Sequence, residues 1–383
     1  MKTVLNSITA VVLASTLVAC GSSSSDDSAD VSPPITGTTG FSYDATSLIK
    51  NVTEEVIIDG YEILNSKATV LHNATLTLLE SKDEAALSAA QQAWKDARVF
   101  WEQGESHIFG PVDSLSIDPH LDTWPLNTAD LEALLASNTS FSASNVKNFD
   151  DGVQGFHTME FLLFGNGLED NNKSIGEMTI REMEYLIACA EVFNIHTQSL
   201  VDAWSISANA GGEPAYKDYL LAPGNNKYAS ELGVIEELVN GVIGIVDEVG
   251  NGKIAEPFGT SKETSDTSLV ESQYSWNSLT DFSNNIVGVK NVFLGTFSGE
   301  NDSPGLKAFI NAGDKELAVK IETQIEAAIA AINAIAGDNN VPFRQAIKDD
   351  VARVRVQAAI DALGSLQASL EEEVVPLIKK WNL

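Results

Sequence analysis

Residues 155–165 read Gly155-Phe156-His157-Thr158-Met159-Glu160-Phe161-Leu162-Leu163-Phe164-Gly165, a histidine and a glutamate three residues apart in an otherwise apolar stretch. On an α-helix this spacing brings the His157 imidazole and the Glu160 carboxylate to one face, about one turn apart. Apolar side chains surround the pair, so we expect a buried helix whose carboxylate needs a partner. Two interpretations fit: a metal ion held by both side chains, or a core histidine satisfied by its neighbour.

Apolar residues recur every three to four positions along most of the chain, and no strand-like alternation competes with this pattern. We therefore predict an all-α fold. Long helices are expected at 53–79, 84–101, 145–164 and 176–204, and again at 227–249, 267–293, 315–336 and 343–381. A Gly-, Pro- and Asn-rich connection at 208–226 separates the two sets. Because about 340 residues exceed what one core usually serves, we predict two tandem helical bundles, 44–215 and 216–383.

The first 20 residues carry the features of a secretory signal: Met1 and Lys2 precede an apolar run that is too short to span a bilayer comfortably. The run ends in Leu17-Val18-Ala19-Cys20, which resembles a bacterial lipoprotein box and implies a lipid on the Cys20 sulfur. An ordinary signal peptide with an incidental cysteine is the alternative. Residues 21–43 are rich in Ser, Asp, Thr, Pro and Gly, so we expect a disordered tether.

The formal net charge is −31, from 54 acidic and 23 basic residues. Such a field repels phosphate backbones and argues against nucleic-acid binding. By resemblance to other lipoproteins, Gly21 after the cysteine favours the outer membrane, with the folded part facing the periplasm or the cell surface. Once Cys20 is lipidated, Cys189 has no intrachain disulfide partner, and its apolar surroundings predict core packing.

The motif Gly155-x-His157-x-x-Glu160 with its apolar continuation resembles the signature of the imelysin-like family, which is named for an insulin-cleaving membrane protease and includes iron-regulated envelope lipoproteins. Three further segments carry the resemblance in the family's order: 97–113, 117–127 and 271–295. The resemblance implies two bundle-like halves related by approximate symmetry. It also implies a pocket built from the helix of Arg98 and the helix of His157.

In that pocket, the resemblance implies that Arg98 orients a carboxylate while Glu102 or Glu105 faces His157 and Glu160. The spacing of four and then three residues between Arg98, Glu102 and Glu105 alone is equally typical of a solvated, charged helix face. One imidazole with two or three carboxylates suits iron, manganese or zinc better than Cu(I). A ferritin-like di-iron set would need a second His and Glu pair. We therefore expect a single divalent or ferric ion, with iron preferred over zinc.

Trp101, Trp124 and Gln273 complete the predicted pocket beside Arg98. Gln273 and Trp276 stand where many relatives carry a basic and a polar residue, which leaves the ligand of this pocket open.

The hypothesis from the sequence is a lipid-anchored envelope protein that binds metal and serves iron acquisition or handling, with iron-transport components as partners. A metallopeptidase of the insulin-cleaving type and an envelope binding module without metal stay as alternatives. Neither the zincin pattern His-Glu-x-x-His nor its inverse fits, because Thr158 follows His157 and Phe161 stands where the inverse needs histidine. We therefore favour a binding protein over an enzyme.

Overall fold

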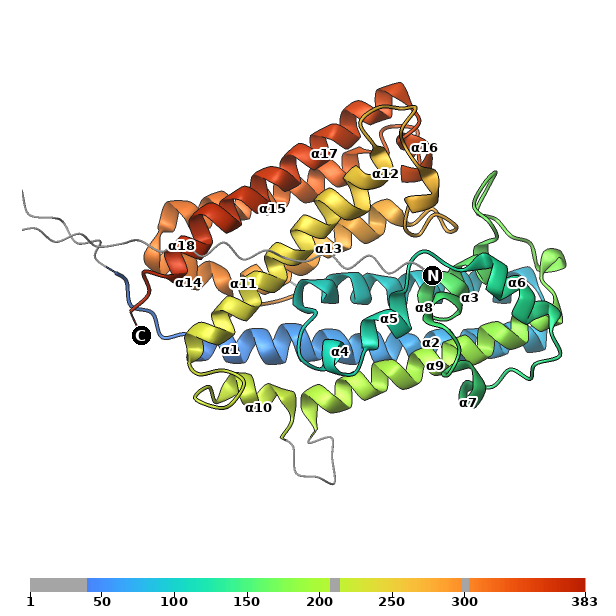
Figure 1. The fold of residues 1–383 in the computed structure, drawn as a ribbon, viewed down its shortest axis with the longest axis horizontal. Coiled ribbons are helices and arrows are strands. Elements are labelled where there is room, and N and C mark those ends of the chain that lie inside the picture. Colours follow the sequence, from blue (N-terminus) through green and yellow to red (C-terminus); the bar gives the residue numbers. More distant parts are fainter. Residues whose placement is uncertain (1–39, 207–213, 298–302, 383) are drawn as a thin grey trace, which may run out of the picture. The chain divides into compact units, whose positions relative to one another are not determined.

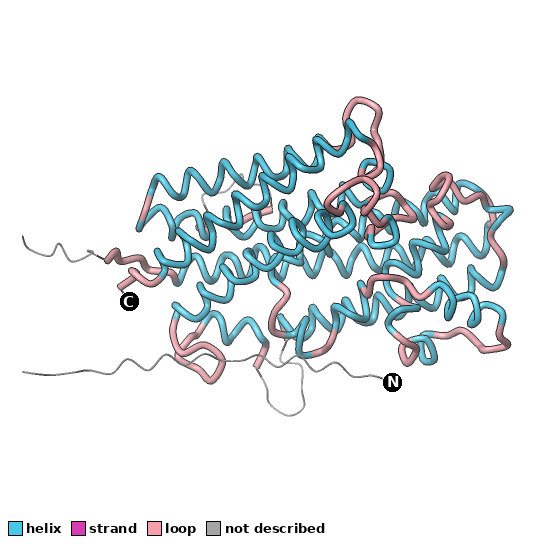
Figure 2. Tube along the Cα trace, turned by 45° about the horizontal axis from the view of Figure 1, so that its top comes forward, coloured by secondary structure: helices cyan, strands magenta, loops and turns pink. Residues whose placement is uncertain are grey.

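The computed structural model describes residues 40–206, 214–297 and 303–382 (Figure 1). All regular elements within these ranges are helices, and the extended pairing there is an isolated parallel bridge between Phe41 and Trp381 (Figure 2). The all-α prediction is confirmed. The predicted signal, Cys20 and nearly all of the tether lie outside the described residues.

The long helices are α2 (Asp59–Ser81), α3 (Glu84–Gly104), α9 (Ile180–Ser205), α11 (Glu231–Asp247), α13 (Ser278–Leu294), α15 (Lys315–Ala334) and α17 (Asp350–Ser369). Short α-helices connect or extend them: α1 (Thr46–Asn51), α4 (Pro111–Ser114), α5 (Ile117–Asp122), α6 (Thr128–Ala136), α7 (Ala143–Val146), α8 (Gly155–Phe164), α10 (Tyr216–Leu221), α12 (Glu256–Phe258), α14 (Leu306–Gly313), α16 (Phe343–Ala346) and α18 (Val375–Ile378). The 3₁₀ turns are η2 (Glu105–His107), η3 (Asp151–Val153), η4 (Ile175–Glu177) and η6 (Thr267–Leu269), and the π turns are η1 (Val52–Ile58), η5 (Glu248–Ala255) and η7 (Leu370–Val374).

The long helices pack side by side in the order α9, α2, α3, α13, α15 and α17 (Figure 1). The contact between α3 and α13 therefore joins the first half of the chain to the second. Helix α8 packs beside α3, α5 packs against α8 and α9, and α11 packs on α13. The described residues belong to one compact unit that starts at Gly40. The division into bundles 44–215 and 216–383 stays a prediction.

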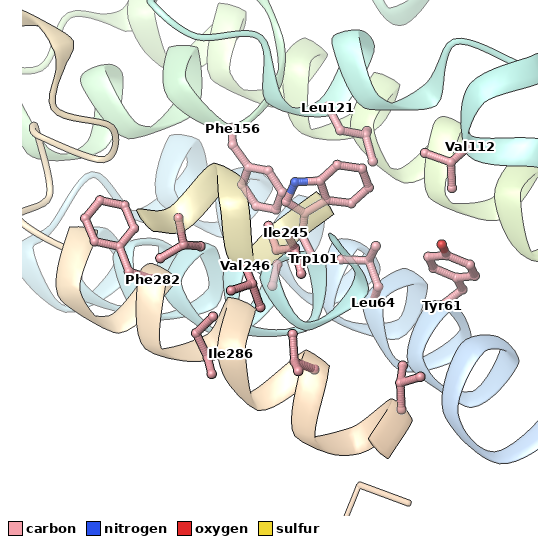
Figure 3. Packing of buried hydrophobic residues seen from close by; sticks show 14 of the residues in the cluster. Tyr61, Leu64, Trp101, Val112, Leu121, Phe156, Ile245, Val246, Phe282 and Ile286 are labelled. Carbon is pink, nitrogen blue, oxygen red and sulfur yellow. The ribbon is translucent and has the colours of Figure 1, made fainter. Parts of the chain in front are cut away.

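Buried apolar side chains from four helices meet near the contact of α3 with α13. Trp101 of α3, Phe156 of α8, Val246 of α11 and Ile286 of α13 belong to this core (Figure 3). Each helix contributes residues at the three-to-four spacing that the sequence predicts. Among the described residues, no helix combines the length and the apolarity that crossing a membrane would require.

Three predicted helices differ from the bounds that the apolar spacing indicates. The helix expected from residue 145 begins at Gly155, and the helix expected from residue 343 is interrupted before α17. At the start of α17, the Asp349 carboxylate accepts hydrogen bonds from the N–H groups of Val351 and Ala352 and caps the new helix. The helix expected from residue 267 begins only at Ser278.

The chain before Ser278 departs from a helix because Ser272 and Trp276 have φ angles of 50° and 60°, in the left-handed region. Residues 270–277, here called the clamp loop, therefore do not extend α13 toward its N-terminus. They fold around the carboxylate of Glu160.

Candidate metal centre in a buried charge cluster

Gly155 sets the position of the motif helix. Its φ is +73°, and a Cβ at this position would lie 2.4 Å from the carbonyl oxygen of Leu121. Only glycine adopts this conformation and this close approach without strain. The first turn of α8 is thereby held against the end of α5, so that His157 of α8 faces Asp122 of α5.

Glu160 connects the motif helix to the clamp loop. One of its carboxylate oxygens, Oε2, lies 2.9 Å from His157 Nδ1. The other, Oε1, accepts hydrogen bonds from the N–H groups of Tyr274 (3.0 Å) and Ser275 (2.7 Å) and from the Ser275 hydroxyl (2.7 Å). Both oxygens are therefore engaged in holding the imidazole and the loop. A carboxylate bound in this way to one ring nitrogen fixes the direction of the other.

The second ring nitrogen of His157, Nε2, points at two further carboxylates. His157 Nε2 lies 3.1 Å from Asp122 Oδ1 and 3.8 Å from Glu271 Oε1. Although His157 is only 1% exposed, Nε2 has no partner in hydrogen-bonding geometry. One ligand atom each of Asp122, His157 and Glu271 lies within 4.8 Å of the others. Trp124 covers the ring, with centroids 4.6 Å apart.

Arg98 lies at the centre of the cluster and is fully buried. Its guanidinium contacts the carboxylates of Asp122, Glu102 and Glu271, and its Nε lies 3.2 Å from Asp281 Oδ2. Arg98, Glu102 and Glu105 are thus buried, and the alternative interpretation of this spacing as a solvated helix face is wrong. The covering element is α13, which carries Asp281.

Lys253 of η5 supplies a second cation. Its ammonium Nζ lies 2.7 Å from Glu105 Oε2, 3.2 Å from Glu271 Oε2 and 3.5 Å from Glu102 Oε2. The Asn285 amide of α13 donates to two of these three glutamates, at 2.6 Å to Glu102 Oε2 and 2.7 Å to Glu105 Oε2. Glu102 and Glu105 also group with Asp122, with ligand atoms within 4.8 Å of one another.

Negative charge is in excess in this cluster. Arg98 and Lys253 contact the buried carboxylates of Glu102, Glu105, Asp122, Glu271 and Asp281, and His157 contacts a sixth, that of Glu160. Taking charges out of water is costly unless opposite charges compensate them. The cluster therefore needs protons or a further cation.

The pKa shifts indicate where protons bind. Burial raises the pKa of Glu102 to about 8, although Arg98 and Lys253 oppose the rise. Burial and the neighbouring Glu102 raise the pKa of Glu105 well above its usual range. Burial lowers the pKa of the His157 imidazole, but the carboxylates of Asp122 and Glu160 outweigh it and raise this pKa to about 9. Protons on these groups occupy positions that a metal ion could take.

The pKa of Asp122 shifts in the opposite direction. Burial alone would raise its pKa, but Arg98 and His157 hold the pKa of the Asp122 carboxyl below its usual range. It is therefore an ionised ligand candidate throughout the neutral range. Glu271 has the same character, because Lys253 and Arg98 outweigh burial and lower its pKa.

A cleft of about 480 Å³ leads to the cluster. It is lined by the acidic residues Glu105, Asp118, Asp122, Glu248, Glu256 and Glu271 and by Pro119, Thr123, Trp124, Pro125, Gly252, Lys253 and Leu269. Cations are attracted into a cleft lined mostly by one sign of charge. The buried carboxylates are therefore open to a small ion from this side.

The structure brings some of the predicted site residues together and separates others. Glu102 and Glu105 lie with Asp122, whereas His157 lies with Asp122 and Glu271, and Glu160 faces the clamp loop. Trp101 of the predicted pocket donates from Nε1 to Asp122 Oδ2 at 2.6 Å. Gln273 is buried in the clamp loop, outside the lining of the cleft.

Sequence reasoning did not single out Asp122, Lys253, Glu271, Asp281 and Asn285. Asp122 and Glu271 lie in segments that carry the family resemblance, so their place in those segments was an available signal. Asp281 and Asn285 also lie in such a segment but look like the polar face of an amphipathic helix. Lys253 lies in a polar stretch with no distinguishing pattern.

Comparison with known proteins confirms the family that the sequence resembles. The family model described as imelysin matches residues 57–370. Over 333 residues the chain is 29% identical to iron-regulated protein A of Synechococcus elongatus, covering 86% of each protein. The crystal structure of a candidate iron-regulated protein A precursor from Parabacteroides distasonis is similar with a TM-score of 0.76 and 28% identity, over 88% of this chain and 95% of that one. An imelysin-like protein from Psychrobacter arcticum shares the fold alone, at 14% identity and a TM-score of 0.69, over 89% and 98% of the two chains.

Proposed function

The chain belongs to the imelysin family, and from this premise we propose that it is a metal-binding protein of the cell envelope that handles iron. The name of its Synechococcus elongatus relative, iron-regulated protein A, supports the choice of iron. The residues themselves support the choice of a metal.

The observation that carries the proposal is the buried His157 Nε2, which lies 3.1 Å from the Asp122 carboxylate and 3.8 Å from that of Glu271. A neutral imidazole with ionised carboxylates is a nitrogen and oxygen ligand set that fits iron, manganese or zinc. These three residues would hold the ion, with Glu102 and Glu105 as further oxygen donors at the same cluster. The excess of buried carboxylates favours the same conclusion, because a cation would neutralise them.

Glu160 has a separate role in this proposal. By binding Nδ1 it keeps the second nitrogen directed at the ion, and by binding Tyr274 and Ser275 it fixes the loop that carries Glu271. A carboxylate that orients a metal-binding histidine also strengthens it as a ligand. Glu160 thus positions two ligands, one on each side of it.

The ion supplies charge neutralisation when bound, and the chain's own groups make binding reversible. Protons compete for His157, Glu102 and Glu105, so acid favours release and alkali favours capture. Such a site suits a protein that takes up a metal and passes it to a partner, and iron-transport components are the partners we propose.

We further propose that Cys20 carries a lipid that anchors the protein to the outer membrane. The support is the Leu17-Val18-Ala19-Cys20 sequence and the polar composition of residues 21–43 behind it. The anchor would keep the metal site in the periplasm or at the cell surface, where incoming iron is met.

Elemental analysis of protein purified without chelator or affinity histidines tests the metal proposal. We expect a metal, with iron prominent, in an amount close to one ion per chain, and retention of that metal by a His72→Ala control. His72 lies on α2, so this control removes an imidazole outside the cluster. If the protein neither carries metal nor binds iron or zinc at micromolar concentrations, the cluster is a proton-compensated core and the proposal fails.

A further inference from the structure

Lys253 contacts three of the carboxylates that are proposed as metal ligands. Its ammonium lies among Glu105, Glu271 and Glu102, at 2.7, 3.2 and 3.5 Å. Glu271 is also the carboxylate that faces His157 Nε2, and Glu102 and Glu105 are the pair that groups with Asp122. Three of the oxygen donors proposed for the metal are therefore paired with this ammonium, whereas the fourth, Asp122, is paired with Arg98. A metal ion that binds Glu102, Glu105 and Glu271 has to replace the ammonium there.

Carboxylates nearer the solvent lie within reach of the Lys253 ammonium. The side chain is 7% exposed and lines the cleft of about 480 Å³. Glu248 lines the same cleft, with its side chain 57% exposed and Oε1 4.0 Å from Nζ. Glu256 lies in that lining as well. A lysine ends in a compact charge on a flexible four-carbon stem, so Nζ can exchange buried carboxylates for those nearer the solvent by rotation alone.

Arg98 lacks this freedom. It is fully buried, absent from the lining of the cleft, and bound to four carboxylates, one of them on α13. Its planar guanidinium is held at several points and cannot leave without breaking its ion pairs, including the one with Asp281 of α13. The two cations of the cluster therefore differ in kind: one is fixed, and the other can be displaced.

The backbone beneath Lys253 is also unusual. It belongs to η5, a π turn within the continuous helix from Glu231 to Phe258. π turns are rare, and they occur frequently at functional sites because the wider turn redirects a side chain. Here the redirected side chain is a lysine that enters a cluster of carboxylates.

We propose that Lys253 is a tethered placeholder cation, which neutralises the metal site in the metal-free protein and moves toward Glu248 when a metal ion binds. This inference rests on the proposed metal binding and adds a determinant of affinity to it. The placeholder keeps the empty site folded, and it weakens metal binding because each ion must displace it. Its return to Glu105 and Glu271 assists release to a partner.

Titration of Mn²⁺ into wild-type protein and into Lys253→Met tests the affinity part. Calorimetry at pH 7.5 should give binding about 10-fold tighter for Lys253→Met, because one positive charge near the ion is gone. Lys262→Met is the matched control, since Lys262 is an exposed lysine paired with Asp350, and its affinity should equal that of the wild type. Unchanged or weaker binding by Lys253→Met, with normal wild-type binding, overturns the placeholder and leaves the proposed function intact.

Amine labelling of the wild-type protein is a second test that does not depend on a variant folding. With an acylating reagent and mass spectrometry, Lys253 should be protected without metal and should react several-fold faster with saturating Mn²⁺, while Lys262 reacts equally in both states. Saturation with Mn²⁺ that leaves Lys253 protected overturns the placeholder alone. Failure of both wild type and Lys253→Met to bind Mn²⁺, Zn²⁺ or Fe²⁺ overturns the proposed function and the placeholder with it.

Discussion

His157 Nδ1 and Glu160 Oε2 lie 2.9 Å apart, and the other oxygen of Glu160 is bound by the backbone of residues 274 and 275. The two residues of the motif therefore differ in what they face: His157 Nε2 faces the carboxylates of Asp122 and Glu271, whereas both oxygens of Glu160 are bound by His157 and the clamp loop. This difference can be measured.

His157→Ala should abolish metal binding, whereas Glu160→Gln should weaken it by about 10- to 100-fold, as is usual for a residue that orients a ligand. The glutamine keeps an oxygen for the clamp loop, so the helical signal should be retained. Isothermal calorimetry with Zn²⁺ compares the two variants. Loss of binding as complete in Glu160→Gln as in His157→Ala would mean that Glu160 is itself a ligand.

Arg98→Met should destabilise the fold by about 3–5 kcal/mol, because it leaves the contacting carboxylates buried without their fixed cation. Chemical denaturation followed by circular dichroism measures the loss. Lys262→Met, which removes an exposed cation, should change stability by less than about 1 kcal/mol. Equal stability of both variants would show that protons alone can neutralise the cluster.

The metal-free protein should lose stability as the pH rises from about 6.5 to 9. His157 has a pKa of about 9 in the folded state, above the usual imidazole value, so its contribution is complete at lower pH and is lost as the imidazolium deprotonates. The pKa of Glu102, raised by burial to about 8, acts in the same direction, because the folded state favours its protonated form.

Melting temperatures between pH 6.5 and 9 test this expectation, with a Glu102→Gln variant for comparison. The variant carries an amide in place of the protonated acid, so its melting temperature should fall less steeply. A wild-type melting temperature that rises over this range would contradict the assignment of protons to the cluster.

Gly155→Ala should cost about 1–3 kcal/mol and weaken metal binding, because a Cβ would strain the left-handed backbone and push α8 away from Leu121. Gly244→Ala is the matched control: Gly244 lies within α11 with open space around its Cβ position, so alanine should stabilise the helix by about 0.5–1 kcal/mol. Thermal denaturation and Zn²⁺ titration of both variants give the comparison. Near-equal metal affinity of both variants would show that metal binding does not depend on the position of α8.

Cys20→Ala should release the protein from the membrane fraction, because it removes the sulfur to which the proposed lipid is attached. Fractionation of cells that express each form, followed by immunoblotting, measures the distribution. A variant that is processed and still sediments with membranes would place the anchor elsewhere.

Much of the fold could be predicted because apolar spacing is a local property. The boundaries of α3 and α9 are close to those expected, and α9 begins with a capping box between Thr179 and Glu182. The clamp loop was expected to be helical, since its residues give no strong turn signal. Its conformation is set by Glu160, more than 100 residues away, which a pattern along the chain does not reveal.

The candidate site was predictable in part for the same reason. Spacing predicts that Arg98, Glu102 and Glu105 share one helical stripe, but burial of that stripe depends on α13 packing over α3 and η2. Asp281 and Asn285 have the spacing of an exposed face until that contact is known. The partners of His157 likewise come from α5 and from the clamp loop, so the motif alone cannot say which carboxylates it meets.

The π turn that carries Lys253 has an evolutionary consequence. A π turn joins residues five apart by hydrogen bonds, where an α-helix joins residues four apart. It therefore holds one residue more than the α-helical turn that it replaces. Removing one residue between Glu248 and Lys253 would restore an ordinary α-helix and turn the lysine about 100° around the axis, away from Glu105 and Glu271. A single deletion would thus take the second cation out of the cluster and leave every carboxylate in place.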